Sequence, residues 1–260
     1  MDNDGLDQGM ARTAAELRMQ LAQMTAASLM LERNAWDEKG RGYLAALNQS
    51  ICRMLRIVGR MELTDRLAAE RPRLESLSTD LGELVGELCQ RMDDLLECTG
   101  VRVVCSVPEH LLARVDAELI RQMLIELTSN AAKAGKRVAV TLERAKSSAV
   151  FTVEDDGPGI PPERVAYLFS GKEEELPDWR RGGTGVAIAR RIAVLHGGTL
   201  VAQCAAGRGL KVTAAIPLGP DGAGGLESPV QRWDQGGFDE AVVGLSHLLP
   251  AKVFTPEEYE

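Results

Sequence analysis

The stretch from Arg121 to Ala134 most constrains what this chain can fold into. At 100° per residue, four apolar side chains of this stretch share one helix face with the residue just before it: Ile120, Met123, Leu124, Leu127 and Ala131. Glu126, Asn130 and Lys133 follow at i, i+4 and i+7, so they form a polar stripe beside that face. Such a stripe is usually a solvated face. It can also serve a polyanion, because an amide oxygen binds Mg²⁺, an amine binds phosphate and an acid activates water.

Composition and charge exclude several classes of function. At 260 residues, the chain can form one good core plus an appended element, or two small domains. The net charge of −8 argues against nucleic acid or an anionic membrane as the main partner. No signal peptide and no apolar run of about 18 residues is present, and the cysteines form no CxxC pair. We therefore expect a cytoplasmic protein with reduced thiols and no membrane span.

The first 76 residues have the pattern of a helical hairpin. Apolar residues between Met10 and Leu31, and again between Leu44 and Met61, alternate at spacings of three and four. Turn residues at 34–40 separate the two runs. Two helices cannot fully cover both stripes, so we expect a homodimer that completes a four-helix bundle. The alternative is a hairpin that packs on the rest of its own chain.

The remaining chain alternates helical and strand patterns, then changes composition. We expect a helix at about 79–96, a strand at 101–107, the polar-stripe helix, strands at 137–144 and 148–155, and a glycine loop that opens a helix ending at 197–198. Two final strands are expected at 199–206 and 210–217. The composition of residues 219–260 predicts a flexible linker followed by a short helix at about 238–249.

The order of three motifs carries a family resemblance. A helix with Glu126 and Asn130 is followed by Asp155-x-Gly157-x-Gly159 and then by a Gly-Thr-Gly loop that opens a helix. This order resembles the nucleotide-binding domain shared by histidine kinases, DNA gyrase, Hsp90 and MutL. The resemblance runs from about Asp80 to Pro217 and implies an ATP-binding domain at 77–218 with an α+β fold, a two-layer α/β sandwich with a mixed sheet. It also implies that the domain binds ATP with Mg²⁺.

The resemblance assigns four residues to the adenine end of the site. Asp155 matches the aspartate that reads adenine, since a carboxylate at the end of a buried strand can accept from the exocyclic amine. Gly157 and Gly159 match glycines that let the backbone approach the base. Ile160 completes this motif.

The phosphate end follows in the same way. Asn130 matches the Mg²⁺-chelating asparagine, and Lys133 lies where histidine kinases often have a phosphate contact. Gly183, Thr184 and Gly185 match the loop whose amides and following helix hold the triphosphate.

One role stays open, and two positions depart from the family pattern. Glu126 matches the residue that activates water in gyrase-type relatives, whereas in kinases this position can be structural or solvent-facing. Ala187 replaces a usual glycine in the phosphate loop, and Leu210 stands at a frequent threonine position. These departures suggest a weaker or altered nucleotide affinity.

The hairpin lacks the residue that a histidine kinase phosphorylates. The segment AELRMQL (15–21) resembles the HELRTPL motif and puts Ala15 at the phosphoacceptor position. The other register puts Gln49 there and leaves no room for a second helix before Asp80. No histidine precedes His110 in either case.

Two functions remain open. The first is an enzyme of the sensor histidine kinase type, a kinase or ATPase that passes phosphate to water or to an unknown protein partner. The second is a non-enzymatic, dimeric ATP-gated adaptor.

Overall fold

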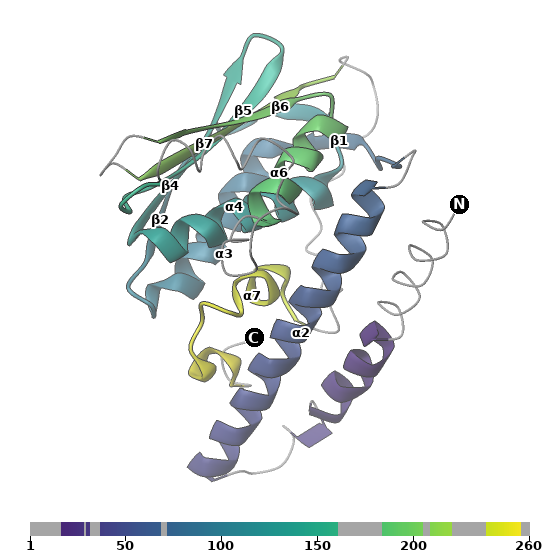
Figure 1. Ribbon diagram of the computed structural model, residues 1–260, viewed down its shortest axis with the longest axis vertical. Helices are drawn as coiled ribbons and strands as arrows, with labels where there is room; N and C mark the ends of the chain where they lie inside the picture. The colour runs from purple at the N-terminus through teal and green to yellow at the C-terminus, as the bar shows by residue number, and fades with distance from the viewer. Residues whose placement is uncertain are drawn as a thin grey trace. The chain divides into compact units, whose positions relative to one another are not determined.

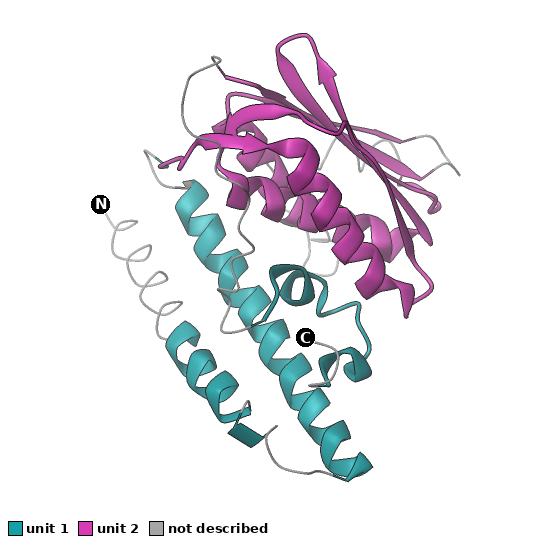
Figure 2. Cartoon of the chain, turned by 180° about the vertical axis from the view of Figure 1, so that it is seen from behind, with its two compact units in different colours: residues 1–72, 231–260 teal, residues 73–230 magenta. Residues whose placement is uncertain are grey.

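The structure, a computed structural model, describes residues 17–28, 30–31, 37–68, 72–160, 184–204, 209–219 and 238–255. It divides into two compact units (Figure 2). One is residues 73–230, and the other joins residues 1–72 with residues 231–260. The sequence predicted domain boundaries at 76/77 and 218/219, with residues 219–260 as a separate linker and tail. In the structure, the residues from 231 onward group with the hairpin.

A five-stranded mixed sheet forms one layer of the larger unit (Figure 1). The strand order is β2-β4-β5-β7-β6, with a parallel pairing between β2 and β4 and antiparallel pairings elsewhere. The bounds are β2 Arg102–Ser106, β4 Arg137–Ala145, β5 Ser148–Asp155, β6 Thr199–Cys204 and β7 Leu210–Pro217.

Three helices form the second layer, on one face of this sheet (Figure 1). They are α3 (Leu81–Glu97), α4 (Ala117–Ala134) and α6 (Thr184–Leu195). The apolar face predicted for α4 is confirmed, because all five of its residues are buried. The expected α+β class, with a mixed sheet and helices, is therefore confirmed.

A separate two-stranded sheet was not predicted. It pairs β1 (Leu77–Asp80) with β3 (Leu112–Val115) in antiparallel register. Each strand has only four residues, which is too short for a clear alternation of apolar and polar side chains. Asp80 also caps α3, with its Oδ1 accepting from the Gly82 N–H at 2.9 Å. The sequence predicted that this helix begins at about Thr79. In the structure it begins two residues later, at Leu81.

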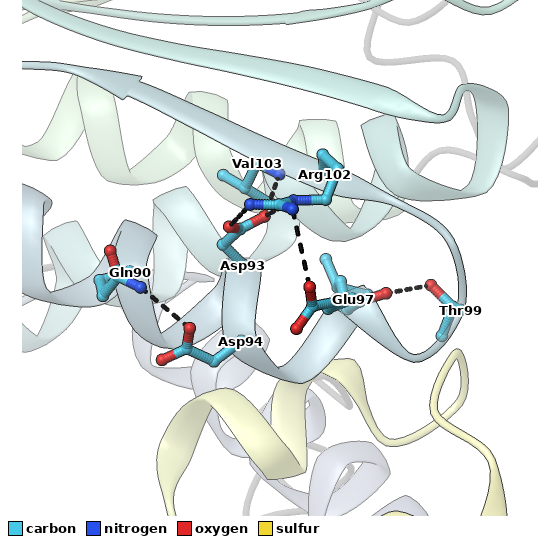
Figure 3. A network of polar contacts seen from close by, with 8 residues as sticks. Gln90, Asp93, Asp94, Glu97, Thr99, Arg102 and Val103 are labelled. Carbon is cyan, nitrogen blue, oxygen red and sulfur yellow. Dashed lines mark hydrogen bonds and ion pairs between the residues drawn. The ribbon is translucent and has the colours of Figure 1, made fainter.

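An ion pair joins α3 to the edge strand β2 (Figure 3). The Arg102 Nε and Nη2 donate to the two carboxylate oxygens of Asp93, at 3.0 and 2.7 Å. The Val103 N–H donates to the same carboxylate at 2.7 Å. These hydrogen bonds, the one from Arg102 first, lower the pKa of Asp93. Asp93 thereby links the helix layer to the start of the sheet.

The smaller unit contains the predicted hairpin. Residues 17–28 and 30–31 are helical, and α2 runs from Glu38 to Ala68. The guanidinium of Arg18 pairs with the carboxylate of Glu62 across the hairpin. The heptad pattern predicted that Leu21 and Ile51 contact a second chain. Both residues are buried inside this unit.

The C-terminal residues are less helical than expected. The predicted helix at 238–249 is shorter, with α7 at Glu240–Leu245 and a 3₁₀ turn, η3, at Ala251–Phe254. Pro250 precedes η3 and has no N–H to extend the α-helical pattern. Both elements contact α2. In the part of the chain described, no helix is long and apolar enough to cross a membrane.

Candidate nucleotide-binding site

The alternation of strand β5 places Asp155 on the core side of the sheet. Ala149, Phe151 and Val153 face the helices and are buried, and Asp155 follows two residues later on the same face. Asp155 is consequently only 5% exposed. Burial raises the pKa of this carboxyl, and the backbone N–H groups of Gly157 and Leu210 act in the opposite direction.

Backbone N–H groups hold both carboxylate oxygens of Asp155. Oδ1 accepts from the Gly157 N–H at 2.9 Å, and Oδ2 accepts from the Leu210 N–H at 3.3 Å. The two donors belong to the loop after β5 and to the start of β7. Each carboxylate oxygen has a second lone pair, so the fixed carboxylate can also accept from a ligand N–H.

Two glycines allow neighbouring backbone segments to close around this carboxylate. A Cβ on Gly157 would lie 2.6 Å from the Ala134 carbonyl oxygen, so the loop crosses the end of α4 closely. Gly209 has a φ of +77°, and a Cβ there would collide with the Asp155 carbonyl oxygen. The predicted Gly157 and Asp155 are therefore brought together.

Cys204 was not predicted as a site residue, yet it links the two loops beside Asp155. Its Sγ accepts from the Ile160 N–H at 3.0 Å and donates to the Gly209 carbonyl oxygen at 3.1 Å. Gly159, one residue before Ile160, has a φ of +74°. The strands expected at 199–206 and 210–217 indicated a turn between them, but local periodicity cannot show which loop that turn contacts.

Helices α4 and α6 bring three further predicted residues together. A Cβ on Gly185, the second residue of α6, would lie 2.6 Å from Asn130 Nδ2 and 2.7 Å from Glu126 Oε2. Glu126 is only 4% exposed, and Asn130 is half-buried. The interpretation of the stripe as a solvated face is therefore wrong for Glu126. The positive end of α6 lies beside this carboxylate and stabilises negative charge there.

The other predicted phosphate residues are less well defined. Lys133 is exposed on the last turn of α4. Thr184 begins α6, and Gly183 lies outside the described residues. Among the residues that the structure describes, no group of three or more His, Cys, Asp or Glu side chains could hold a metal ion. A Mg²⁺ bound through Asn130 would therefore need phosphate and water oxygens as its other ligands, which is how this ion is commonly held.

A conserved-domain comparison bears on this site. Residues 115–220 match the family described as histidine kinase-, DNA gyrase B- and HSP90-like ATPase. Residues 115–220 belong to this ATPase family. The matched range contains every predicted site residue, from Glu126 on α4 to Gly185 on α6.

The chain is also similar to curated proteins that are named as kinases or sensor proteins. Sporulation kinase D of Bacillus subtilis is 24% identical over 80% of this chain and 41% of its own length. Sensor protein ChvG of Rhizobium meliloti is 27% identical over 81% of this chain and 40% of its own. The adaptive-response sensory kinase SasA of Crocosphaera subtropica is 29% identical over 82% and 59%. The chain thus spans about two fifths of the length of the first two relatives.

Solved structures support the same fold. Full-length ShkA in complex with AMPPNP superposes with a TM-score of 0.67 and 23% identity, over 83% of this chain and 47% of that one. The histidine kinase AdeS of Acinetobacter baumannii gives a TM-score of 0.53 and 20% identity, over 77% and 95%. These structures show the fold, and the family match over residues 115–220 identifies a histidine kinase-like ATPase domain.

One histidine inside the ATPase-family domain has a structural position. His196 Nδ1 donates to the Ile192 carbonyl oxygen at 2.8 Å, and Nε2 accepts from the Asp116 N–H at 3.1 Å. Burial lowers the pKa of His196, so the imidazole is neutral at pH 7. His196 therefore joins the end of α6 to the residue that caps α4.

Proposed function

We propose that the chain is an ATP-binding signal-transduction protein of the sensor histidine kinase type, without a phosphoacceptor histidine of its own. The observation that carries this proposal is the geometry of Asp155. Its carboxylate is buried, held at both oxygens and framed by two closely packed glycines. It can accept a hydrogen bond from the exocyclic amine of adenine while still holding its backbone donors.

We infer that the phosphates lie toward Asn130 and the first turn of α6. Asn130 offers an amide oxygen, Lys133 offers an ammonium on the next turn of α4, and the helix N-terminus favours anions. A Mg²⁺ ion held there would neutralise phosphate charge. Glu126 lies beside the same turn, where a carboxylate could orient water or could hold α6 in place.

The fate of the phosphate depends on the hairpin. Ala15 stands at the phosphoacceptor position of the chosen register, and it lies outside the described residues. A methyl side chain cannot attack the γ-phosphate. We therefore propose transfer to water or to a partner protein. Homodimer formation and a cytoplasmic location stay predictions.

Incubation with γ-labelled Mg-ATP tests this account. The protein alone should form no acid-labile, base-stable phosphohistidine, and phosphohistidine in the unmodified chain would refute the register. Ala15→His tests the rest of the machinery: strong labelling would indicate a kinase core that lost only its acceptor. Glu126→Gln adds a second measurement, because loss of ATP turnover with ATP binding retained would assign Glu126 to catalysis.

A second candidate is an ATP-gated adaptor without catalysis. Leu210 favours it, since the side chain there has no hydroxyl and only its backbone N–H reaches Asp155. Ala187 adds a side chain where the family commonly has glycine. An adaptor would bind ATP, leave it intact over hours and show no labelling of Ala15→His.

The hairpin supports a proposed homodimer through part of the expected heptad stripes, because Leu21 and Ile51 are buried while other residues of the stripes stay exposed. Leu17, Met24 and Leu31 recur every seven residues and are 44%, 40% and 41% exposed. Met54 and Ile57 are exposed on α2. Apolar stripes of this kind on paired helices are typical of helix-bundle interfaces. We therefore assign the second copy to these residues.

A further inference from the structure

The C-terminal segment, residues 238–255, follows one face of helix α2 in the smaller unit (yellow in Figure 1). Four side chains of α2 donate to four backbone carbonyls of this segment. From the N-terminal end of α2, they are Asn48, Gln49, Arg53 and Arg56, which we call the docking face. Their acceptors are the carbonyl oxygens of Phe254, Leu249, Ser246 and Gly244, so the segment runs antiparallel to α2.

Two of these hydrogen bonds recognise the end of a helix. The Arg56 Nε donates to the Gly244 carbonyl oxygen at 2.9 Å, and the Arg53 Nε donates to that of Ser246 at 3.4 Å. Ser246 is the C-cap of α7, so both guanidinium groups lie at the negative end of that helix. The docking face therefore binds a helix C-terminus through charge-assisted hydrogen bonds.

The far end of the segment is fixed in the interior of the unit. Phe254 is fully buried, and its carbonyl oxygen accepts from the Asn48 Nδ2 at 3.3 Å. The Asn48 Oδ1 accepts from the Ser28 hydroxyl of the first hairpin helix. Asn48 and Ser28 are buried polar groups in an apolar interior. Their hydrogen bonds are specific, because a buried polar group without a partner is costly.

We infer that the docking face of α2 is a peptide-binding site and that the chain's own C-terminal segment is its ligand. The segment acts as a latch. The chain leaves the hairpin unit after residue 72 and returns to it at residue 231. With the segment docked, the ATP-binding unit is therefore tethered to the hairpin at both ends. After its release, that unit is tethered at one end only. Any partner that uses this face of α2 must displace the segment.

A buried thiol provides a direct readout of docking. Cys52 lies one helical turn from both Asn48 and Arg56, on the same side of α2, and is fully buried. Burial raises the pKa of the Cys52 thiol to about 12, so it resists alkylation. The rate of Cys52 alkylation in the intact protein, measured for each cysteine by mass spectrometry, reports whether the segment is docked. The measurement needs no nucleotide.

Phe254→Ala should release the segment, because truncation of a buried phenylalanine removes a large part of the free energy that holds the segment in place. Alkylation of Cys52 should become faster by roughly a hundredfold or more. Lys252→Ala is the matched control, because its side chain is exposed on the same 3₁₀ turn. Cys89, buried in the other unit, should stay unreactive and so exclude global unfolding. Exposed Cys98 gives the rate of an open thiol.

A milder pair of variants keeps the test valid if Phe254→Ala fails to fold. Gln49→Ala removes the hydrogen bond to the Leu249 carbonyl oxygen, 2.7 Å long, and should speed Cys52 alkylation by about fivefold, the equivalent of one hydrogen bond. Ser50→Ala should have no effect, because the Ser50 hydroxyl donates to Ala46 within α2. If wild-type Cys52 reacts as fast as Cys98, or if Gln49→Ala matches Ser50→Ala, the inference is wrong.

Discussion

Replacing Asp155 by asparagine should weaken ATP binding without unfolding the ATP-binding domain. Both carboxylate oxygens accept backbone N–H groups, from Gly157 and from Leu210. An asparagine has one acceptor oxygen and must turn its NH₂ group toward one of these donors. Asparagine also lacks the negatively charged carboxylate oxygen that would accept a hydrogen bond from the exocyclic amine of adenine.

The size of the effect follows from one charged hydrogen bond. Such a bond typically contributes about 1.5–3 kcal/mol, and each 1.4 kcal/mol is about a factor of ten in affinity. Calorimetry should therefore show ATP binding that is weaker by about 10- to 140-fold in Asp155→Asn. The amide also removes the penalty of a buried charge, which partly offsets the lost backbone hydrogen bond. The domain should consequently stay folded.

The neighbouring residue provides a matched control. Asp156 is exposed, and its Oδ1 alone accepts from both the Lys136 and the Arg137 N–H, at 2.7 and 2.9 Å. Asp156→Asn can keep both hydrogen bonds, so it should bind ATP like the wild type. Inosine triphosphate, with a carbonyl in place of the amine, should bind weakly to the wild type and lose less affinity in Asp155→Asn. Equal affinities of Asp155→Asn and Asp156→Asn for ATP would refute the assignment of Asp155.

Three further predictions test other parts of the molecule. Asn130→Ala should weaken binding of Mg-ATP far more than binding of adenosine, and equal losses in calorimetry would mean that Asn130 only supports the fold. Met24→Glu with Met54→Glu should give monomers by light scattering with an unchanged helical circular dichroism signal, whereas a wild type already monomeric at tens of micromolar would exclude the proposed interface. His196 has a pKa below its usual 6.5, so the folded state binds fewer protons and the free energy of unfolding should fall as the pH drops below about 6.5. His196→Gln should flatten this fall between pH 7.5 and 5.5 in urea titrations, and an unchanged slope would contradict the structural role.

The sequence predicted those parts of the site whose signals are local. The buried face of α4 follows from helical periodicity, and the burial of Asp155 follows from the alternation along β5. Nothing local shows that the Leu210 N–H reaches Asp155, because the partners are 55 positions apart.

The hairpin shows the same limit. Leu21 and Met24 occupy equivalent apolar positions in the heptad pattern, yet Leu21 is buried within the unit and Met24 is exposed. The heptad pattern predicts which residues form an apolar surface, but it does not predict what each of these residues packs against. Docking of the C-terminal segment was missed for a similar reason, since the side chain of Asn48 and the carbonyl of Phe254 are 206 positions apart.

The return of the chain to α2 also has a consequence for biosynthesis. The ribosome makes the hairpin first, then the ATP-binding unit, and residues 238–255 only afterwards. The ATP-binding unit can therefore fold during translation while the hairpin still has an uncovered face on α2. Contacts with such long sequence separation form slowly, and the uncovered apolar surface is exposed to aggregation meanwhile. Nascent chains that stall before Phe254 should thus be the species most in need of a chaperone.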